Sequence, residues 1–372
     1  MAEQDATLDR IVELQVRRPM PKRPRMPLPR AALLRFYDAE RRELPWRATR
    51  DPYAIWVSEV MLQQTRVETV IPYFERFIAR FPSAEALAGA SEDEVMAEWS
   101  GLGYYRRARQ LHAGAREVLE RYGGQLPEAA EARRALPGIG RYTAGAIGSI
   151  AFDLPEPIVD GNVARVLCRY HAIDTPLGKA ETERRLWSEA ERLVQGPRPG
   201  DLNQALMELG ATICTPQGAR CGSCPIAPGC QARRGDRVGE LPTPRQRKAP
   251  AEQRWAAVVA TSDRGREIWL ERSTTALFGG LWGLPMRPRA LGSDGALEAR
   301  EALREAGLRA RFGPDQPREL RHLLTHRVLL VQVRRATATR GVSSDRLRPF
   351  TREALAEVGV SALTLRLIEV VA

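Results

Sequence analysis

Residues 136–147 read LPGIGRYTAGAI, and in this stretch Gly138 and Gly140 flank a single isoleucine. The glycine pair predicts a tight turn between two helices. Backbone N–H groups at the start of the second helix then point outward, where they can bind a phosphate. We interpret the stretch as a helix–hairpin–helix motif, which binds the DNA backbone without reading its sequence. The alternative is an ordinary corner between two helices.

The residues on either side of this motif have the apolar spacing of helices. Apolar residues recur every three or four positions over 55–62 and 67–77, and the pattern continues from Leu33 to about Leu209. Prolines, among them Pro72, are expected to separate the segments. The sequence therefore predicts an all-α region of many short helices.

Two acidic residues lie in patterns that suit acid–base chemistry. Glu59, within WVSEVMLQQTRV (56–67), shares a helix face with apolar residues, which predicts a raised pKa. Asp160, within VDGNVARVL (159–167), precedes a helix start, whose N–H groups are expected to lower its pKa. The alternatives are a salt-bridged glutamate and an N-cap aspartate. Spacing alone does not select these two among 46 acidic residues.

Four of the five cysteines form a C-x6-C-x2-C-x5-C array within seventeen residues: Cys214, Cys221, Cys224 and Cys230. Four converging thiolates need a cation, and both a tetrahedral zinc ion and a cubane iron–sulfur cluster meet that need. Zinc arrays usually pair two C-x2-C knuckles, and only one short pair is present here. Either group would be structural, because all four ligand positions are filled.

Composition narrows the class of protein. The 372 residues suggest two or three domains, and 57 Lys and Arg against 46 Asp and Glu give a net charge of +11. Such an excess of positive charge favours binding to polyanionic partners, of which nucleic acid is the first candidate. No apolar run reaches the length of a membrane span, and the N-terminus lacks the features of a secretory signal. A cytoplasmic protein is therefore expected.

The pattern changes toward both ends of the chain. Residues 16–30 are rich in proline and basic side chains and are expected to form a disordered leader, and 231–254 are expected to form an exposed linker. After the linker, two strand-like runs flank a turn at 263–265. A helix over 296–306 and a strand over 326–333 complete a small C-terminal α/β domain.

Together, the helix–hairpin–helix motif, Asp160 and the cysteine array resemble the iron–sulfur DNA glycosylases of base excision repair. The resemblance covers about residues 31–230. It implies a mainly α catalytic region with the helix–hairpin–helix glycosylase fold, and one 4Fe-4S cluster on the four cysteines. The implied division is a leader (1–30), a cluster domain (31–48 plus 153–230), a six-helix domain (49–152), a linker (231–253) and a C-terminal domain (254–372).

The residue two positions after Gly140 distinguishes branches of this superfamily. Members that also cut the DNA strand carry a lysine there, whereas this chain has Tyr142, and a phenol cannot form a Schiff base. The chain therefore resembles the monofunctional adenine DNA glycosylases. That resemblance implies Glu59 as general acid, Asp160 as stabiliser of the oxocarbenium ion or as nucleophile, and Tyr142 and Asn162 as their supports. It places Arg47 and Gln204 near the adenine, and Gln64 and Tyr104 in the base stack.

The C-terminal domain resembles a Nudix fold of the kind that senses 8-oxoguanine. LFGGLWGLP (277–285) carries the likeness, while the stretch matching the catalytic Nudix box, 300–308, has Arg304 in place of a metal-binding acid. The domain is therefore expected to read a base rather than to hydrolyse nucleotides. Family members commonly place Phe-Ser-His in the recognition loop. This chain has Leu324, Thr325 and His326, which keep the hydroxyl but lose the aromatic ring.

The resemblance implies an adenine DNA glycosylase that acts on adenine opposite 8-oxoguanine or guanine in double-stranded DNA. The protein is expected to be a monomer that binds no membrane and lies in a bacterial-type cytoplasm, associated with the nucleoid. One alternative is a monofunctional thymine mismatch glycosylase, which can share the Tyr142 arrangement. Others are a non-catalytic damage sensor, against which the retained acidic pair argues, and a Nudix pyrophosphohydrolase, against which the degraded box argues.

Overall fold

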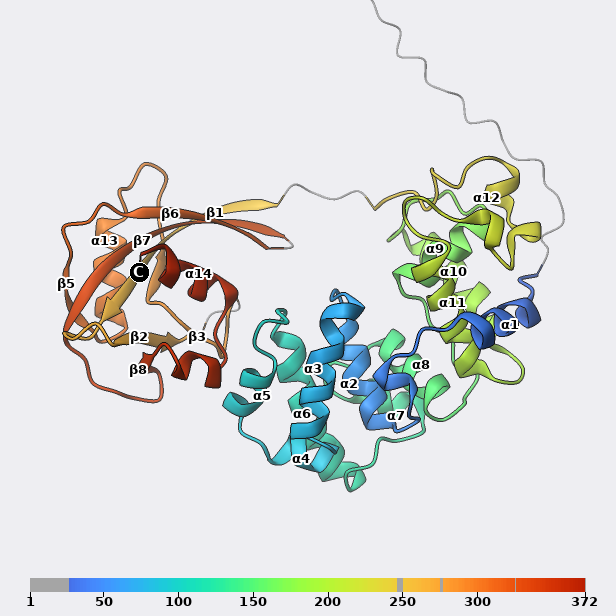
Figure 1. Cartoon of the computed structure of the whole chain (residues 1–372), viewed down its shortest axis with the longest axis horizontal. Coiled ribbons are helices and arrows are strands. Elements are labelled where there is room, and N and C mark those ends of the chain that lie inside the picture. Colours follow the sequence, from blue (N-terminus) through green and yellow to red (C-terminus); the bar gives the residue numbers. More distant parts are fainter. Residues whose placement is uncertain (1–26, 246–249, 275–276, 325, 372) are drawn as a thin grey trace, which may run out of the picture.

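The computed structural model describes residues 27–245, 250–274, 277–324 and 326–371. A helical region is followed by a region built around a β-sheet (Figure 1). Within these ranges, none of the helices has the combination of length and hydropathy that crossing a membrane requires. The helical region contains α1 (Arg30–Glu40), η1 (Pro45–Arg47), α2 (Pro52–Leu62), α3 (Val67–Arg80), α4 (Ala84–Gly89), α5 (Glu92–Glu98), α6 (Arg106–Tyr122), α7 (Ala130–Ala135), α8 (Arg141–Ile150), α9 (Gly161–Tyr170), α10 (Ala180–Val194), α11 (Pro199–Thr212), η2 (Cys221–Ser223), η3 (Ala227–Gly229) and α12 (Gln231–Arg234).

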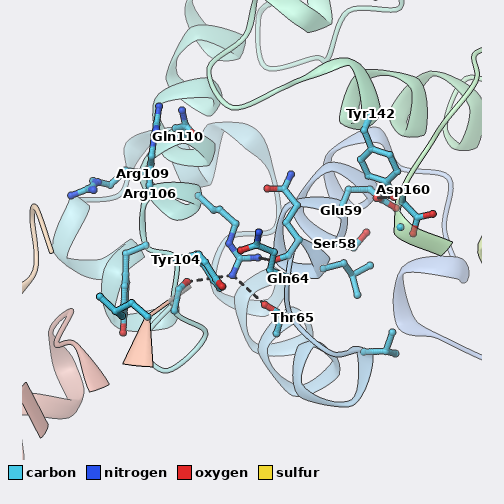
Figure 2. Close-up of a pocket in the computed structure, with 18 of the residues that line it drawn as sticks. Ser58, Glu59, Gln64, Thr65, Tyr104, Arg106, Arg109, Gln110, Tyr142 and Asp160 are labelled. Atoms are coloured by element: carbon cyan, nitrogen blue, oxygen red, sulfur yellow. Dashed lines mark hydrogen bonds between the residues drawn. The ribbon is translucent and has the colours of Figure 1, made fainter. Parts of the chain in front are cut away.

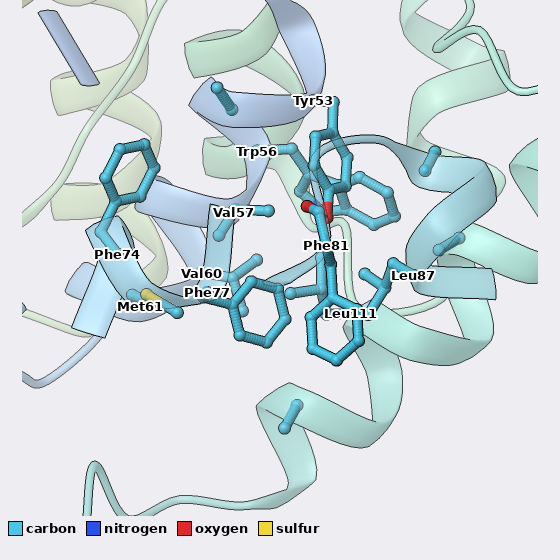
Figure 3. Close-up of a cluster of buried hydrophobic side chains, with 14 of the residues drawn as sticks. Tyr53, Trp56, Val57, Val60, Met61, Phe74, Phe77, Phe81, Leu87 and Leu111 are labelled. Carbon is cyan, nitrogen blue, oxygen red and sulfur yellow. The ribbon is translucent and has the colours of Figure 1, made fainter. Parts of the chain in front are cut away.

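Helix α2 is the centre of the first hydrophobic core. Asp51 caps its start by accepting hydrogen bonds from the N–H groups of Tyr53 and Ala54, and Pro52 occupies the first turn. Most of its residues are buried, and aromatic side chains of α3 and of the turn after it pack alongside (Figure 3). Glu59 is thus carried into the interior by a helix that is apolar on nearly all sides.

Pro72 lies inside α3 and does not end it. The expectation that this proline separates two helical segments is wrong. A proline removes one N–H from the helix interior. The apolar face of α3 remains continuous across the proline, and Val70, Phe74 and Phe77 are all buried in the first core. Tertiary packing therefore outweighs the local cost.

A second core joins the two ends of the helical region. Leu33, Phe36 and Tyr37 of α1 share this core with apolar residues of α9 and α11, although about 160 residues separate α1 from α11. The cysteine loop packs on the same core through Ile226. The loop that holds the four thiols is therefore anchored on helices drawn from distant parts of the chain.

The segment after the cysteines differs from the expected exposed linker. Residues 231–234 form α12, and Ala232 and Leu241 are buried. The Arg169 Nε–H donates to the carbonyl of Leu241 (2.8 Å), and the Thr243 hydroxyl donates to the carbonyl of Asp174 (2.7 Å). Isolated apolar residues in a basic stretch thus fix its first half to the helical region.

The C-terminal region is a mixed sheet between two helices. Its strands β1 (Ala251–Thr261) and β7 (Arg327–Arg340) pair in parallel along their length, whereas β1 meets β2 (Glu267–Arg272) at Thr261 and Ile268 in an antiparallel hairpin. The turn expected at 263–265 is confirmed. The other elements are β3 (Trp282–Gly283), β4 (Met286–Pro288), α13 (Ala296–Glu305), β5 (Arg309–Phe312), β6 (Arg318–Leu324), β8 (Leu347–Thr351), η4 (Ala354–Glu357) and α14 (Ala362–Val370).

Alternate residues of β1 enter two different cores. Ala256 and Val258 pack with residues of α13, whereas Ala257 and Val259 pack with residues of α14. Both faces of the central strands are therefore covered by helices. This arrangement confirms a C-terminal region with mixed α/β architecture, compatible with a Nudix-like domain.

The two regions touch through α5 and the start of α6. The Asp93 carboxylate forms an ion pair with Arg272, and the Tyr105 hydroxyl donates to the carbonyl of Val360 (3.0 Å). Leu281 of the sheet region is buried in the first helical core. These contacts hold the sheet region beside the helical region, with α5 nearest to it (Figure 1).

Candidate active site

A cavity of about 1090 Å³ lies between the helices and the sheet region. It brings together nine of the residues that the sequence singled out. Figure 2 shows Glu59, Tyr142 and Asp160 at one end of it, with Gln64 and Tyr104 further along. The nine lining residues are Arg47, Glu59, Gln64, Tyr104, Tyr142, Asp160, Asn162, Gln204 and His326.

Glu59 is the buried carboxyl group of this cavity. It is 4% exposed, and the Tyr142 hydroxyl donates to its Oε2 at 2.7 Å. Burial raises the pKa of Glu59 to about 7, although the Tyr142 hydrogen bond opposes the shift. The carboxyl group therefore exchanges its proton near neutral pH, as a general acid and base must.

Asp160 caps α9 and lies beside Asn162. Its Oδ1 accepts from the N–H of Val163 (2.7 Å) and its Oδ2 from the Asn162 side chain (2.9 Å). These donors lower the pKa of Asp160 as expected, but burial raises it by more. The predicted net lowering of the Asp160 pKa is therefore wrong. Removal from water outweighs the hydrogen bonds at the helix start.

Sequence reasoning missed the partners of Arg47. Its Nη2 donates to Glu208 Oε2 (2.8 Å), and the Nε of Arg42 donates to Glu208 Oε1 (2.7 Å). The Glu208 side chain is fully buried. Burial alone would raise its pKa, but the two arginines hold that pKa below its ordinary value. A glutamate within the apolar run of α11 was the available signal in the sequence.

Gln64 and Tyr104 occupy two loops at the mouth of the cavity. Both have left-handed backbones, with φ of 60° and 49°. Tyr104 is 45% exposed, so its ring is accessible to a ligand. Both side chains lie between the helical region and the sheet region, and Figure 2 shows them close together.

The helix–hairpin–helix turn joins α7 to α8 outside the cavity. Gly138 has φ of +77°, and a Cβ there would lie 2.8 Å from the Cβ of Gln110, so this position requires glycine. Gly140 is extended and is the N-cap of α8, and no atom crowds it. The space beside Gly140, at the start of α8, is therefore open.

The four cysteines line one small pocket beside α9. All four are free thiols, and Arg169 Nη1 lies 3.3 Å from the Cys214 sulfur. Burial raises the pKa of Cys224 to about 11, and the neighbouring thiols act in the same direction. Among the described residues, no three His, Cys, Asp or Glu side chains are placed to hold a single metal ion. Four thiols around one pocket supply the donor set that an iron–sulfur cluster takes, and the Arg169 guanidinium lies beside one of them.

The structure describes only part of the loop at 324–326, for which the sequence predicted contact with the lesion. Thr325 lies outside the described residues. Leu324 and His326 line the cavity from the side opposite the helices, together with Phe278. The cavity thus has one wall of carboxylates and arginines and a second wall from the sheet region.

Comparison with known proteins supports the family that the motifs indicate. Residues 57–192 match the model of the HhH-GPD superfamily base excision DNA repair protein. The chain is 52% identical over 221 residues to an adenine DNA glycosylase of Mus musculus, covering 57% of this chain and 43% of the relative. It is 37% identical over 244 residues to one from Buchnera aphidicola subsp. Schizaphis graminum, covering 65% and 70%.

A solved structure of a thermostable thymine-DNA glycosylase is also similar. It is 32% identical, with a TM-score of 0.51, and the match covers 55% of this chain and 95% of that protein. The chain spans less than half the length of the mouse relative. On the combined identity and coverage, the chain belongs to the adenine DNA glycosylase family within the HhH-GPD superfamily of base excision DNA repair proteins.

Proposed function

We propose that this protein is a monofunctional adenine DNA glycosylase that hydrolyses the N-glycosidic bond of adenine paired with 8-oxoguanine or guanine. The observation that carries the proposal is Glu59, a buried carboxyl group with a pKa of about 7 that faces the cavity beside Asp160. Enzymes that break glycosidic bonds commonly use two carboxyl groups in one cavity as their catalytic groups.

The target adenine has to leave the duplex to reach Glu59. Flipping costs a few kcal/mol and is easiest at a mispair, which contributes to selectivity. Gln64 and Tyr104 would fill the gap in the stack, because an amide binds base edges and a phenol ring stacks on bases. Arg47 and Gln204 would contact the base inside the cavity.

The chemistry follows from the two carboxyl groups. Protonated Glu59 donates its proton to adenine N7, and the C1′–N9 bond breaks with its electron pair passing to the base. The carboxylate of Asp160 stabilises the oxocarbenium ion or adds to C1′. The positive sugar favours the ionised form of Asp160. Water then attacks C1′ and gives a proton to Glu59, which leaves an abasic site and restores the acid.

Tyr142 and Asn162 support the two acids. Burial raises the pKa of Tyr142 well above its ordinary value, and the two carboxyl groups raise it further, so its hydroxyl stays neutral and donates to Glu59. The Asn162 amide orients Asp160. Neither side chain can form a Schiff base with an opened sugar, so strand incision is not expected.

We also propose that Cys214, Cys221, Cys224 and Cys230 hold one 4Fe-4S cluster. When bound, the cluster would cross-link the loop that follows α11 and so stabilise the fold around Asp160. The Arg169 guanidinium lies where it would offset negative charge on the thiolates. The protein would act as a monomer in a bacterial-type cytoplasm, with double-stranded DNA as its partner.

The sheet region is proposed to read 8-oxoguanine through the loop around His326. In α13, the stretch that matches a Nudix box places Glu305 beside Arg287 (2.7 Å), which also lies 3.6 Å from Glu271. The arginine between these carboxylates neutralises the negative charge that a bound magnesium ion would otherwise neutralise. This geometry argues against pyrophosphohydrolase chemistry.

Three labelled duplexes test the proposed activity: adenine opposite 8-oxoguanine, adenine opposite guanine, and thymine opposite guanine. Each product is divided and analysed with and without hot alkali. We expect cleavage of the adenine strand, strongest opposite 8-oxoguanine and only after alkali. Cleavage of the thymine strand instead would support the thymine enzyme, to which the solved relative also points. Incision without alkali would contradict a monofunctional enzyme.

Removing the Tyr142 hydroxyl is expected to move the pH dependence of excision upward. Excision requires protonated Glu59, so the single-turnover rate should fall as pH rises through about 7. The Tyr142 hydrogen bond lowers the pKa of Glu59, so Tyr142→Phe should shift the midpoint upward by roughly 0.5–1 unit. Rates between pH 5.5 and 9 measure the shift. An unchanged or lowered midpoint would contradict the proposed pairing.

A further inference from the structure

Two loops present the side chains that would enter the DNA stack. The α2–α3 loop (63–66) carries Gln64, and the α5–α6 loop (99–105) carries Tyr104. Both residues have left-handed backbones, a conformation that is unfavourable for residues other than glycine. Such a backbone persists only where surrounding contacts hold it. A residue that contacts both loops would therefore set how they face DNA.

Arg107, in the first turn of α6, makes those contacts. Its Nη1 donates to the carbonyl of Gln63, and its Nη2 donates to Thr65 Oγ1 at 3.2 Å, both in the α2–α3 loop. The same Nη2 donates to the carbonyl of Gly103 (3.3 Å) in the α5–α6 loop. Its guanidinium also lies over the Tyr104 ring, 5.3 Å from the ring centre. Figure 2 shows Gln64, Thr65 and Tyr104 close together at this point.

Arg107 also anchors itself at the end of α2. Its Nη1 donates to the carbonyls of Val60 (2.8 Å) and Met61 (2.9 Å), which lie in the last turn of that helix. The side chain stacks on buried Trp99, whose Nε1 donates to the Gly103 carbonyl (3.1 Å). Arg107 is thus fixed to rigid elements on one side and holds two loops on the other.

The charge of Arg107 is balanced by backbone dipoles. The residue is 8% exposed, and no carboxylate in the described part of the chain forms an ion pair with it. Burial lowers its pKa to about 10, so it remains a cation at neutral pH. Carbonyls at a helix C-terminus favour a cation. The Nη1 and Nη2 groups of the planar guanidinium together serve five acceptors at this site, whereas glutamine or lysine has too few donors in the right places.

We propose that Arg107 is a positioning residue that couples the α2–α3 and α5–α6 loops, so that Gln64 and Tyr104 meet DNA as one preformed unit. The coupling itself is a property of the free protein. Its consequence for catalysis rests on the proposed glycosylase function. Arg107 does not touch the reacting atoms. It acts through the two loops on base-stack insertion and lesion discrimination.

Hydrogen–deuterium exchange of the intact protein tests the coupling without any substrate. In Arg107→Gln, we expect amides of both loops to exchange at least tenfold faster, while α8 and α9 keep their protection. Arg30→Gln is the matched control, because Arg30 also donates to three backbone carbonyls, of Leu193, Gln195 and Pro197, away from the cavity. Faster exchange in only one loop, or equally throughout the helical region, would overturn the proposal.

Single-turnover excision tests the functional consequence. Arg107→Gln should weaken binding of the adenine–8-oxoguanine duplex by about 10–100-fold and reduce discrimination against the guanine mispair. The pH midpoint set by Glu59 should not move. A Tyr104→Ala change should cost less in the Arg107→Gln background than alone. Additive effects or a shifted midpoint would overturn a role through the loops. If the wild type excises no base, the proposed function fails, and the exchange experiment still decides the coupling.

Discussion

Replacing Glu59 with glutamine is expected to reduce adenine excision by about 10³-fold, because an amide cannot donate the proton that the leaving base requires. Glutamine has nearly the same shape and can still pair with the Tyr142 hydroxyl, so the cavity should keep its form. Single-turnover excision from the adenine–8-oxoguanine duplex measures the loss. Retained binding of that duplex serves as the control, and near-normal turnover would refute the role of Glu59 as acid.

The same variant should be more stable than the wild type in alkaline solution. The pKa of Glu59 is about 7 in the folded protein against a model value of 4.5, so the folded state holds its proton more tightly than the unfolded state. The group therefore destabilises the fold increasingly as pH rises from 4.5 to 7. We expect Glu59→Gln to add about 3 kcal/mol at pH 8 and under about 1 kcal/mol at pH 5. Denaturant unfolding at the two pH values would show a constant difference if the carboxyl group were not buried.

Replacing Glu208 with alanine should be among the most damaging single changes in the helical region. It would leave Arg42 and Arg47 without the carboxylate they share in the interior. Breaking such a buried ion pair costs about 3–5 kcal/mol, because an uncompensated charge stays out of water. The partly exposed Arg42 can turn toward solvent, so we expect about 3 kcal/mol. Chemical denaturation at pH 7 measures this change in unfolding free energy.

A surface ion pair provides the matched control for Glu208. Glu98 pairs with Arg76 at 2.7 Å, but half of the Arg76 side chain is exposed. Glu98→Ala should therefore cost under about 1 kcal/mol. The pKa of Glu208 is lowered in the folded protein, so its contribution is present above the unfolded pKa and is lost as pH falls through the folded one. Equal costs for the two variants would mean that water reaches Glu208.

Local sequence patterns predicted the parts of the site that local structure determines. Gly138 lies in a turn that only glycine fits, and Asp160 precedes a helix start, as its neighbours in the sequence indicated. Glu59 could be assigned to an apolar helix from spacing alone. The family resemblance then selected these acids from the many others in the chain. Their catalytic roles remain predictions.

Features that depend on distant residues could not be predicted in this way. Arg42 and Glu208 are 166 positions apart, and no periodicity links them. The pKa of Asp160 depends on how completely the cavity excludes water, which its own helix does not determine. Arg107 looks like any basic residue in GLGYYRRA until two loops fold around it. Each of these depends on tertiary packing.

The packing of α1 on α11 also affects the order in which the two cores can form during synthesis. During synthesis, α1 leaves the ribosome about 160 residues before α11 exists. At about 5–20 residues per second, that gap lasts roughly 10–30 s. Throughout that time the apolar face of Leu33, Phe36 and Tyr37 lacks α11, although other parts of its core, such as α9, are made earlier. The first core, made from residues 44–147 with the single addition of Leu281, can form largely during translation. The second core is completed later, because it needs both ends of the helical region.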